Sequence, residues 1–292
     1  MITDADTSRA YWHCTAITRS AARNFYYGIS LLPKDKRVAL CAVYALARRI
    51  DDIGDEPAPP AEKRAALDAA RRALSEMDTA ADPVLIAVAD AARRYPIPLP
   101  AFTELVDGVA LDVEMDLTER RYADFGELVR YCRRVAGSIG RLCLGVFGCR
   151  PDPEAPRLAD ALGIALQQVN ILRDIREDLT VGRVYLPQED LDRFGVRLAL
   201  DERGRLIDPE HRLAALVSEL AERARWWFGR GQRLLPLLDR RSAACCGTMS
   251  GIYRGLLDRI AADPTLVFDQ RLSLSTRHKA AIAGRALLGV AR

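Results

Sequence analysis

The sequence of 292 residues predicts an all-α protein. Apolar residues recur with the period of an α-helix, and no run alternates between apolar and polar residues for more than a few positions. Ala, Leu and Arg, which are good helix formers, dominate the composition. No segment is long or polar enough to separate domains, so residues 1–292 are expected to form a single domain.

Proline residues mark where the expected helices end. The prolines used for this purpose cluster at residues 57–60, 96–100 and 151–156, and three more stand singly at residues 187, 209 and 264. In chain order, the apolar periodicity predicts helices near residues 8–22, 35–55, 61–78, 83–94, 100–117, 124–148, 154–179, 209–237, 241–262 and 277–290.

Composition and charge argue against several classes of protein. The net charge is only +3, from 43 basic and 40 acidic residues, so no nucleic-acid partner is expected. No stretch approaches the roughly 18 apolar residues of a membrane-spanning helix, and the start, MITDADTSRAYWH, does not resemble a secretory signal. The seven cysteines form no C-x-x-C pair and the three histidines are isolated, which argues against zinc and di-iron motifs. We expect a reduced, cytoplasmic protein.

Two of the expected helices are apolar and then end in carboxylates. Residues 38–47 read VALCAVYALA and continue as RRIDDIGDE, and the helix from Ala161 reads ALGIALQQVNILRDIRED. The helix macrodipole is negative at this end, so each carboxylate there is disfavoured by a few tenths of a kcal/mol up to about 1 kcal/mol. Two apolar helices with the same unfavourable placement indicate a compensating cation.

The polar residues at each of these ends share one helix face. The first face carries Arg48, Asp51, Asp52 and Asp55, with Tyr44 one turn earlier, and the second carries Gln167, Asn170, Asp174 and Asp178. Oxygen ligands without His or Cys favour a hard cation, Mg²⁺ or alternatively Mn²⁺. Since Mg²⁺ completes its coordination with water and phosphate oxygens, two such faces would hold metal ions with a diphosphate between them. The apolar walls would accept a hydrocarbon.

Other interpretations of these motifs remain open. A single D-x-x-x-D on a helix is usually a solvated face. An all-α nucleotide pyrophosphatase also uses paired acidic helix motifs for Mg²⁺, so a metal site by itself does not identify the substrate.

Four segments carry a more specific pattern. They are FYYGISLLPKDKRVALCAVYALARRIDDIGDE (25–56), YCRRVAGSIGRL (131–142), QQVNILRDIREDLTVGRVYLP (167–187), and IYRGLLDRI with RLSLSTRHK (252–279). Together they resemble the squalene/phytoene synthase family of head-to-head prenyl synthases over nearly the whole chain. The resemblance implies the class I isoprenoid synthase helical fold with a central prenyl-binding cavity.

The resemblance also implies roles for individual residues. The metal ligands would be Asp51, Asp52, Asp55, Asn170, Asp174 and Asp178, and catalysis would involve Asp51, Asp55, Asp174, Asp178 and Tyr131. Substrate would be bound by Asn24, Phe25, Arg48, Val135, Gly137, Gly140, Gln167, Asn170, Arg173, Arg183, Tyr185, Tyr253 and Arg271. The family often has serines just before Phe25; here Asn24 and Arg23 would have to supply that diphosphate contact.

Several of these residues also have a purely structural interpretation. Tyr131 and Tyr185 could be core tyrosines with satisfied hydroxyl groups. The glycines of the second segment could simply permit close helix packing. Arg48 could be a local ion partner of the neighbouring aspartates, and Arg271 could belong to a solvated basic face with residues 277–279.

The resemblance implies condensation of two identical allylic prenyl diphosphates. The amino-acid sequence of residues 23–33 and 48–55 resembles that of the bacterial presqualene diphosphate synthases. It therefore implies farnesyl diphosphate as substrate and presqualene diphosphate as product, with Mg²⁺ and without NADPH. The alternatives are a phytoene synthase using geranylgeranyl diphosphate, a squalene or dehydrosqualene synthase, and a non-catalytic family member. Enzymes of hopanoid or carotenoid biosynthesis would be the partners.

The C-terminal segment suggests a further interaction. Residues 277–292 read RHKAAIAGRALLGVAR and are both basic and apolar. Such a helix can lie on a membrane surface without spanning it. Peripheral contact with the inner face of the membrane is therefore expected.

Overall fold

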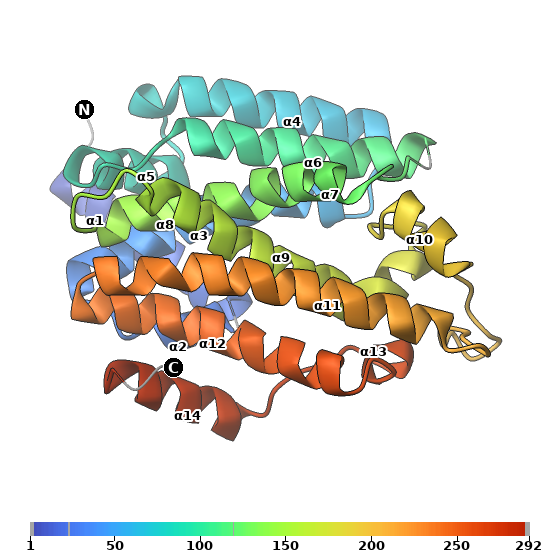
Figure 1. Cartoon of the computed structure of the whole chain (residues 1–292). Helices are drawn as coiled ribbons and strands as arrows, with labels where there is room; N and C mark the ends of the chain where they lie inside the picture. The colour runs from blue at the N-terminus through green and yellow to red at the C-terminus, as the bar shows by residue number, and fades with distance from the viewer. Residues whose placement is uncertain (1–2, 23, 119, 290–292) are drawn as a thin grey trace.

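The computed structural model describes residues 3–22, 24–118 and 120–289, and these residues form helices without a β-strand (Figure 1). The longer helices are α1 (Asp4–Ala21), α3 (Lys34–Asp55), α4 (Pro60–Ser75), α5 (Pro83–Arg94), α6 (Pro100–Thr118), α9 (Ala155–Thr180), α11 (Arg212–Gly231), α12 (Arg240–Ala262) and α14 (Thr276–Leu287). The shorter ones are α2 (Phe25–Ile29), α7 (Phe125–Cys132), α8 (Ser138–Phe147), α10 (Gln188–Phe194) and α13 (Leu266–Asp269). The predicted all-α class is confirmed.

Local sequence explains where two of the helices begin. Thr3 caps α1, because its side chain accepts a hydrogen bond from the backbone of Asp6 at 3.2 Å and the Asp6 carboxylate accepts one in return. α11 begins three residues later than Pro209, since His211 has a φ of 57° and cannot continue a helix. The Asp208 carboxylate caps the start of α11, because it accepts hydrogen bonds from the backbone N–H groups of Leu213 and Ala214.

The helix expected over residues 124–148 is interrupted. α7 passes into a π-helical turn, Arg133–Gly137, before α8 continues the segment. A π-turn inserts one extra residue per turn and is frequent at functional sites. Here it lies against α9: a Cβ at Gly163 of α9 would lie only 2.2 Å from the carbonyl oxygen of Ala136 in the π-turn. The short helices α2, α10 and α13 were not predicted, because one or two turns are too short to show a period.

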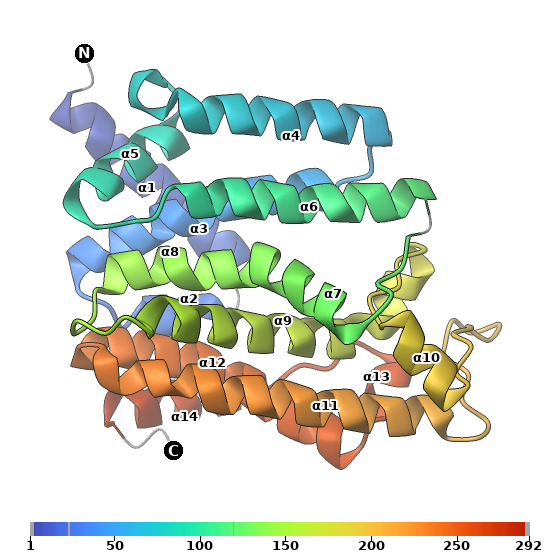
Figure 2. The ribbon, with the colours of Figure 1, turned by 45° about the horizontal axis from the view of Figure 1, so that its top comes forward.

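The long helices pack in a series, each against the next. α4 packs on α6, α6 on α8, α8 on α9, and α9 on α11, which also packs with α12. Figure 2 shows α4, α6, α9 and α11 at successive levels across the molecule. α3 contacts α1, α5, α6 and α8. The two helices with acidic ends, α3 and α9, are therefore both packed against α8.

One hydrophobic core joins these helices. All residues from Ala39 to Val43 on α3 are buried, as the uniformly apolar sequence of this segment predicted. None of the helices in the described ranges is long and apolar enough to cross a membrane. α14 packs on α12, with Ala286 buried and Leu288 exposed beyond its end; residues 290–292 of the basic, apolar tail lie outside the described residues.

We expect the close approach of α9 to the π-turn to limit substitution at Gly163. A Cβ at Gly163 would lie 2.2 Å from the carbonyl oxygen of Ala136. Gly163→Ala should therefore lower the free energy of unfolding by about 1–3 kcal/mol, measured by urea denaturation. Gly229→Ala is the matched control, because a Cβ at this exposed position of α11 would meet nothing within 4 Å. Gly229→Ala should raise the free energy of unfolding by roughly 0.5–1 kcal/mol. If both substitutions changed this free energy in the same direction, the close packing at Gly163 would be contradicted.

Candidate active site

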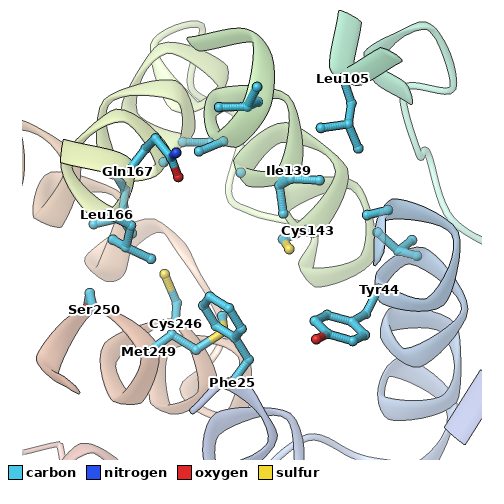
Figure 3. Close-up of a pocket in the computed structure, with 18 of the residues that line it drawn as sticks. Phe25, Tyr44, Leu105, Ile139, Cys143, Leu166, Gln167, Cys246, Met249 and Ser250 are labelled. Atoms are coloured by element: carbon cyan, nitrogen blue, oxygen red, sulfur yellow. The ribbon is translucent and has the colours of Figure 1, made fainter. Parts of the chain in front are cut away.

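A largely apolar cavity lies between the helices that carry the acidic motifs. Figure 3 shows side chains from α2, α3, α6, α8, α9 and α12 directed into it. Its walls are formed by Phe25, Ile29, Leu40, Val43, Tyr44, Ala47, Leu105, Tyr131, Val135, Ala136, Ile139, Gly140, Cys143, Phe147, Ala159, Leu162, Gly163, Leu166, Leu234, Cys246, Met249 and Ser250. Including its open mouth, the cavity holds about 1390 Å³ of empty space.

The polar residues lining the cavity come from the ends of α3 and α9. They are Arg48 and Asp51 from α3, and Gln167 and Asn170 from α9. The cavity therefore has an apolar body and a polar rim, and the rim is built from the two helix faces identified in the sequence. Such a shape fits an amphiphile with a hydrocarbon chain and a charged head.

On the first motif, the three aspartates have different surroundings. Arg48 binds Asp52 at 2.5 Å and lies 3.6 Å from Asp51. Asp51 lines the cavity with about half of its side chain exposed, and partial desolvation by the walls together with the nearby Asp55 carboxylate raises its pKa to about 7. The group that faces the cavity is thus a carboxylate whose charge is poorly compensated by the protein.

On the second motif, Asp174 is held by two guanidinium groups. Arg173 donates to its two oxygens at 2.7 and 2.5 Å, and Arg271 donates at 2.8 and 2.9 Å. Burial would raise the pKa of Asp174, but these hydrogen bonds hold it below its ordinary value. A cation bound by Asp174 would have to displace one arginine, and Arg271 is the more exposed of the two.

Asp178 lacks such compensation. It forms no ion pair with a described residue, and burial together with the Asp174 carboxylate raises its pKa to about 8. On the same helix, the Asn170 amide donates to Gln167 at 3.1 Å, whereas its buried Oδ1 has no hydrogen-bond partner. An orphaned amide oxygen and an uncompensated carboxylate suit a hard cation.

The acidic residues do not form a closed metal cage. Within the described ranges, no group of three or more His, Cys, Asp or Glu side chains is close enough to hold a metal ion. This is compatible with Mg²⁺, which takes one or two carboxylates from a protein and completes its shell with water and phosphate oxygens. The residues present therefore fit a Mg²⁺–diphosphate site.

Arg183 connects the ends of three helices. Its guanidinium donates to the Gly54 carbonyl at 2.8 Å and to Asp116 at 2.7 and 2.8 Å, and it lies 3.5 Å from Asp55. Its own backbone N–H donates to the carbonyl of Asp178 at 2.9 Å. The two aspartate motifs, which lie more than one hundred residues apart in sequence, are thus joined through one residue.

Aromatic side chains pack together at the wall of the cavity. The ring of Phe25 stacks on Tyr253 with centroids 5.7 Å apart and lies 6.4 Å from Tyr44. Tyr253 is buried beside Arg173 and does not line the cavity itself. Two rings of this aromatic cluster, those of Phe25 and Tyr44, therefore form part of the cavity wall.

The remaining predicted residues are distributed unevenly. Val135 and Gly140 line the cavity, as the resemblance implies. Gly137 does not: a Cβ there would meet Asp160 of α9 at 2.9 Å, so this glycine permits close packing. Asn24 also lies outside the lining and its side chain does not cap α2. Arg23 lies outside the described residues.

The sequence did not point to three residues of the site, Asp112, Asp116 and Lys63. Asp112 accepts hydrogen bonds from the buried hydroxyls of Tyr131 and Tyr185, and Asp116 is bound by Arg183 and Lys63. The signal was present, because Asp112 and Asp116 form a third D-x-x-x-D at the end of an apolar helix. This motif has no in-face Asn or Gln, and it was not distinguished from a solvated face.

Comparison with known proteins identifies the family. The squalene/phytoene synthase family profile matches residues 18–278. Phytoene synthase from Mycobacterium tuberculosis is 56% identical over 282 residues, covering 97% of this chain and 92% of that protein. The 15-cis-phytoene synthase of Synechococcus elongatus is 34% identical over 290 residues, covering 94% and 91% of the two chains.

Solved structures give the same result. A dehydrosqualene synthase in complex with a ligand superposes with a TM-score of 0.84 at 26% identity, covering 98% of both chains. The squalene synthase HpnC from Alicyclobacillus acidocaldarius superposes with a TM-score of 0.77 at 30% identity, covering 89% of this chain and 96% of that one. These matches confirm the isoprenoid synthase fold expected from the sequence. The chain belongs to the squalene/phytoene synthase family and is an enzyme of the prenyltransferase type.

Proposed function

We propose that this protein condenses two molecules of geranylgeranyl diphosphate in the route to phytoene. The observation that carries the proposal is the 56% identity to a phytoene synthase over 97% of the chain. The apolar cavity with its acidic rim supports it, because both substrates combine a long hydrocarbon with a diphosphate. Presqualene diphosphate formation from farnesyl diphosphate was the first expectation from the sequence, and the relatives favour the phytoene alternative over it.

The head groups of the substrates would be bound at the rim. Arg48 lines the cavity, Arg271 lies at the second aspartate motif, and Arg183 lies between the two motifs. Guanidinium groups suit this task, since their planar forks bind phosphate oxygens in pairs. Asp51 and Asp178 would hold Mg²⁺ with the orphaned oxygen of Asn170. When bound, Mg²⁺ neutralises the charge of the leaving diphosphate.

The reaction then follows from the chemistry of the substrates. The C–O bond of one allylic diphosphate breaks, and the bonding electrons leave with the diphosphate. The double bond of the second molecule attacks the allylic cation, and loss of a proton closes a cyclopropane ring. Tyr131, which lines the cavity, would accept that proton. Loss of the second diphosphate and another proton leaves a new double bond, so no NADPH is consumed.

The cavity walls must keep water from the cation. Phe25 and Tyr44 line the cavity, and Tyr253 stacks behind Phe25. Their rings replace water beside the reacting carbons. Aromatic faces also attract a cation, by about 0.5–2 kcal/mol in proteins. The walls therefore protect the intermediate and stabilise it.

Removing either poorly compensated carboxylate should separate activity from stability. Asp51→Asn and Asp178→Asn should each reduce Mg²⁺-dependent diphosphate release at least about a hundredfold, because charge stabilisation at the leaving group is lost. The circular dichroism spectrum should not change. Asp178→Asn should also unfold at the same or a higher temperature than the metal-free protein, since one of two repelling carboxylates is gone.

Asp35→Asn is the control for these variants. Asp35 is exposed in the first turn of α3, at the opposite end of that helix from Asp51. The control should keep its activity within about twofold. Full activity in Asp51→Asn or Asp178→Asn would remove that aspartate from the metal site.

The preferred chain length can be measured directly. With Mg²⁺ and no NADPH, mass spectrometry of the products should show at least tenfold faster turnover of geranylgeranyl than of farnesyl diphosphate. Cys143→Phe should reverse part of this preference, because Cys143 lines the cavity and a phenyl ring there shortens it. Cys149→Phe is the control, since Cys149 is exposed outside the cavity. Faster turnover of farnesyl diphosphate by the unmodified protein would instead support presqualene diphosphate formation.

A further inference from the structure

A buried carboxylate lies behind the wall of the cavity. Asp112 is on α6, and only 8% of its surface is exposed. Its Oδ2 accepts a hydrogen bond from the hydroxyl of Tyr131 at 3.1 Å, and its Oδ1 accepts one from Tyr185 at 2.8 Å. It forms no ion pair within the described part of the chain. Two phenols are therefore its direct partners.

The surroundings of Asp112 are aromatic. The rings of Tyr122 and Tyr185 both pack on Tyr131, each with centroids 5.3 Å from it. Burial raises the pKa of Asp112 to about 6, although the nearby Arg183 guanidinium and the two phenols act in the opposite direction. An apolar residue would fill this space without the cost of burying a charge. A carboxylate retained here is a candidate for a functional role.

The carboxylate determines which way the phenols point. An ionised carboxylate has only acceptor sites, so both tyrosine hydroxyls must donate to it. The hydrogen of Tyr131 is then directed at Asp112, and the lone pairs of its oxygen are left for other contacts. Tyr131 lines the cavity whereas Tyr185 does not, so Tyr131 is the one of the two phenols that adjoins the substrate space.

We propose that Asp112 is a positioning residue that makes Tyr131 a proton acceptor in the condensation. This inference rests on the proposed function. In the ring-closing step, a C–H proton of the cationic intermediate passes to the Tyr131 oxygen, and the C–H electrons form the last bond of the cyclopropane. The phenol's own proton passes to Oδ2 of Asp112. Tyr131 stays neutral, the carboxylate becomes a carboxylic acid, and that acid loses its proton before the next turnover.

The transfer to Asp112 has a physical reason. A neutral phenol is a very weak base, so it can take a proton from carbon only while its own hydrogen leaves. Asp112 is the hydrogen-bonded acceptor that permits this exchange. Without it, the cation lives longer and is captured by water, giving a prenyl alcohol in place of a condensed product.

The substitution that tests the proposal is Asp112→Asn. The amide keeps the shape of the carboxylate but can accept from only one phenol and donates to the other. We expect kcat for condensed product to fall by roughly ten- to a hundredfold, with KM changed by less than about twofold. We also expect diphosphate release to exceed what the condensed product accounts for, with prenyl alcohols making up the difference in the mass spectrum.

Two further variants isolate the role of Tyr131. Tyr131→Phe should cause the same excess of diphosphate release without changing the buried carboxylate. Tyr185→Phe should cause a smaller excess of diphosphate release than Tyr131→Phe, because the Tyr131–Asp112 hydrogen bond remains. If Asp112→Asn fails to fold, these two variants still decide the question: a normal ratio in Tyr131→Phe overturns the proposal.

Asp107→Asn is the matched control. Asp107 is on the same helix, is half-exposed, and pairs with Arg71 at 2.7 Å away from the cavity. It should change neither kcat nor the product ratio. If Asp112→Asn loses stability and activity together at a normal product ratio, its role is only structural and the proposal is wrong. If the unmodified protein makes no condensed product from any prenyl diphosphate, the proposed function fails and this inference fails with it.

Discussion

Negative charge at three helix ends is the constraint on which the site depends. α3, α6 and α9 all place carboxylates near their C-terminal ends, where the helix dipole is also negative. Arg183 is bound between these ends, through Gly54, Asp116 and the backbone of Asp178. Protein cations compensate Asp52, Asp116 and Asp174, whereas Asp178 has no such partner among the described residues and Asp51 only a distant one. The uncompensated pair defines where an external cation would be bound.

The apolar cavity depends on a second constraint, which is how closely the helices approach. Where α8 and the π-turn press against α9, Gly140 and Gly163 leave no room for a Cβ. This packing is tight at the backbone, while the side chains on the other faces of α3, α8 and α9 stop short of one another. The fold thus combines close helix contacts with an apolar space between the helices, and the aromatic cluster around Phe25 forms part of the wall of that space.

The two tyrosines behind the rim link these features. Tyr131 lines the apolar cavity, and Asp112 behind it belongs to the same helix as Asp116, which binds Arg183. The charge network at the rim and the phenols at the wall are therefore held by one turn of α6. A change in the position of α6 would act on both the diphosphate site and the wall next to the reacting carbons.

Local sequence determined the long helices, the buried character of α3, the two aspartate motifs and the family. These features depend on residues within a few turns of one another, so the apolar periodicity and the residues of each motif reveal them. Only the tertiary structure decided which carboxylates are compensated. Asp52 and Asp51 are neighbours with the same chemistry, yet Arg48 binds the first more closely and the cavity receives the second. The contacts of Asp112 and Gly137 were likewise decided by side chains from other helices, because packing between elements far apart in the chain fixes them.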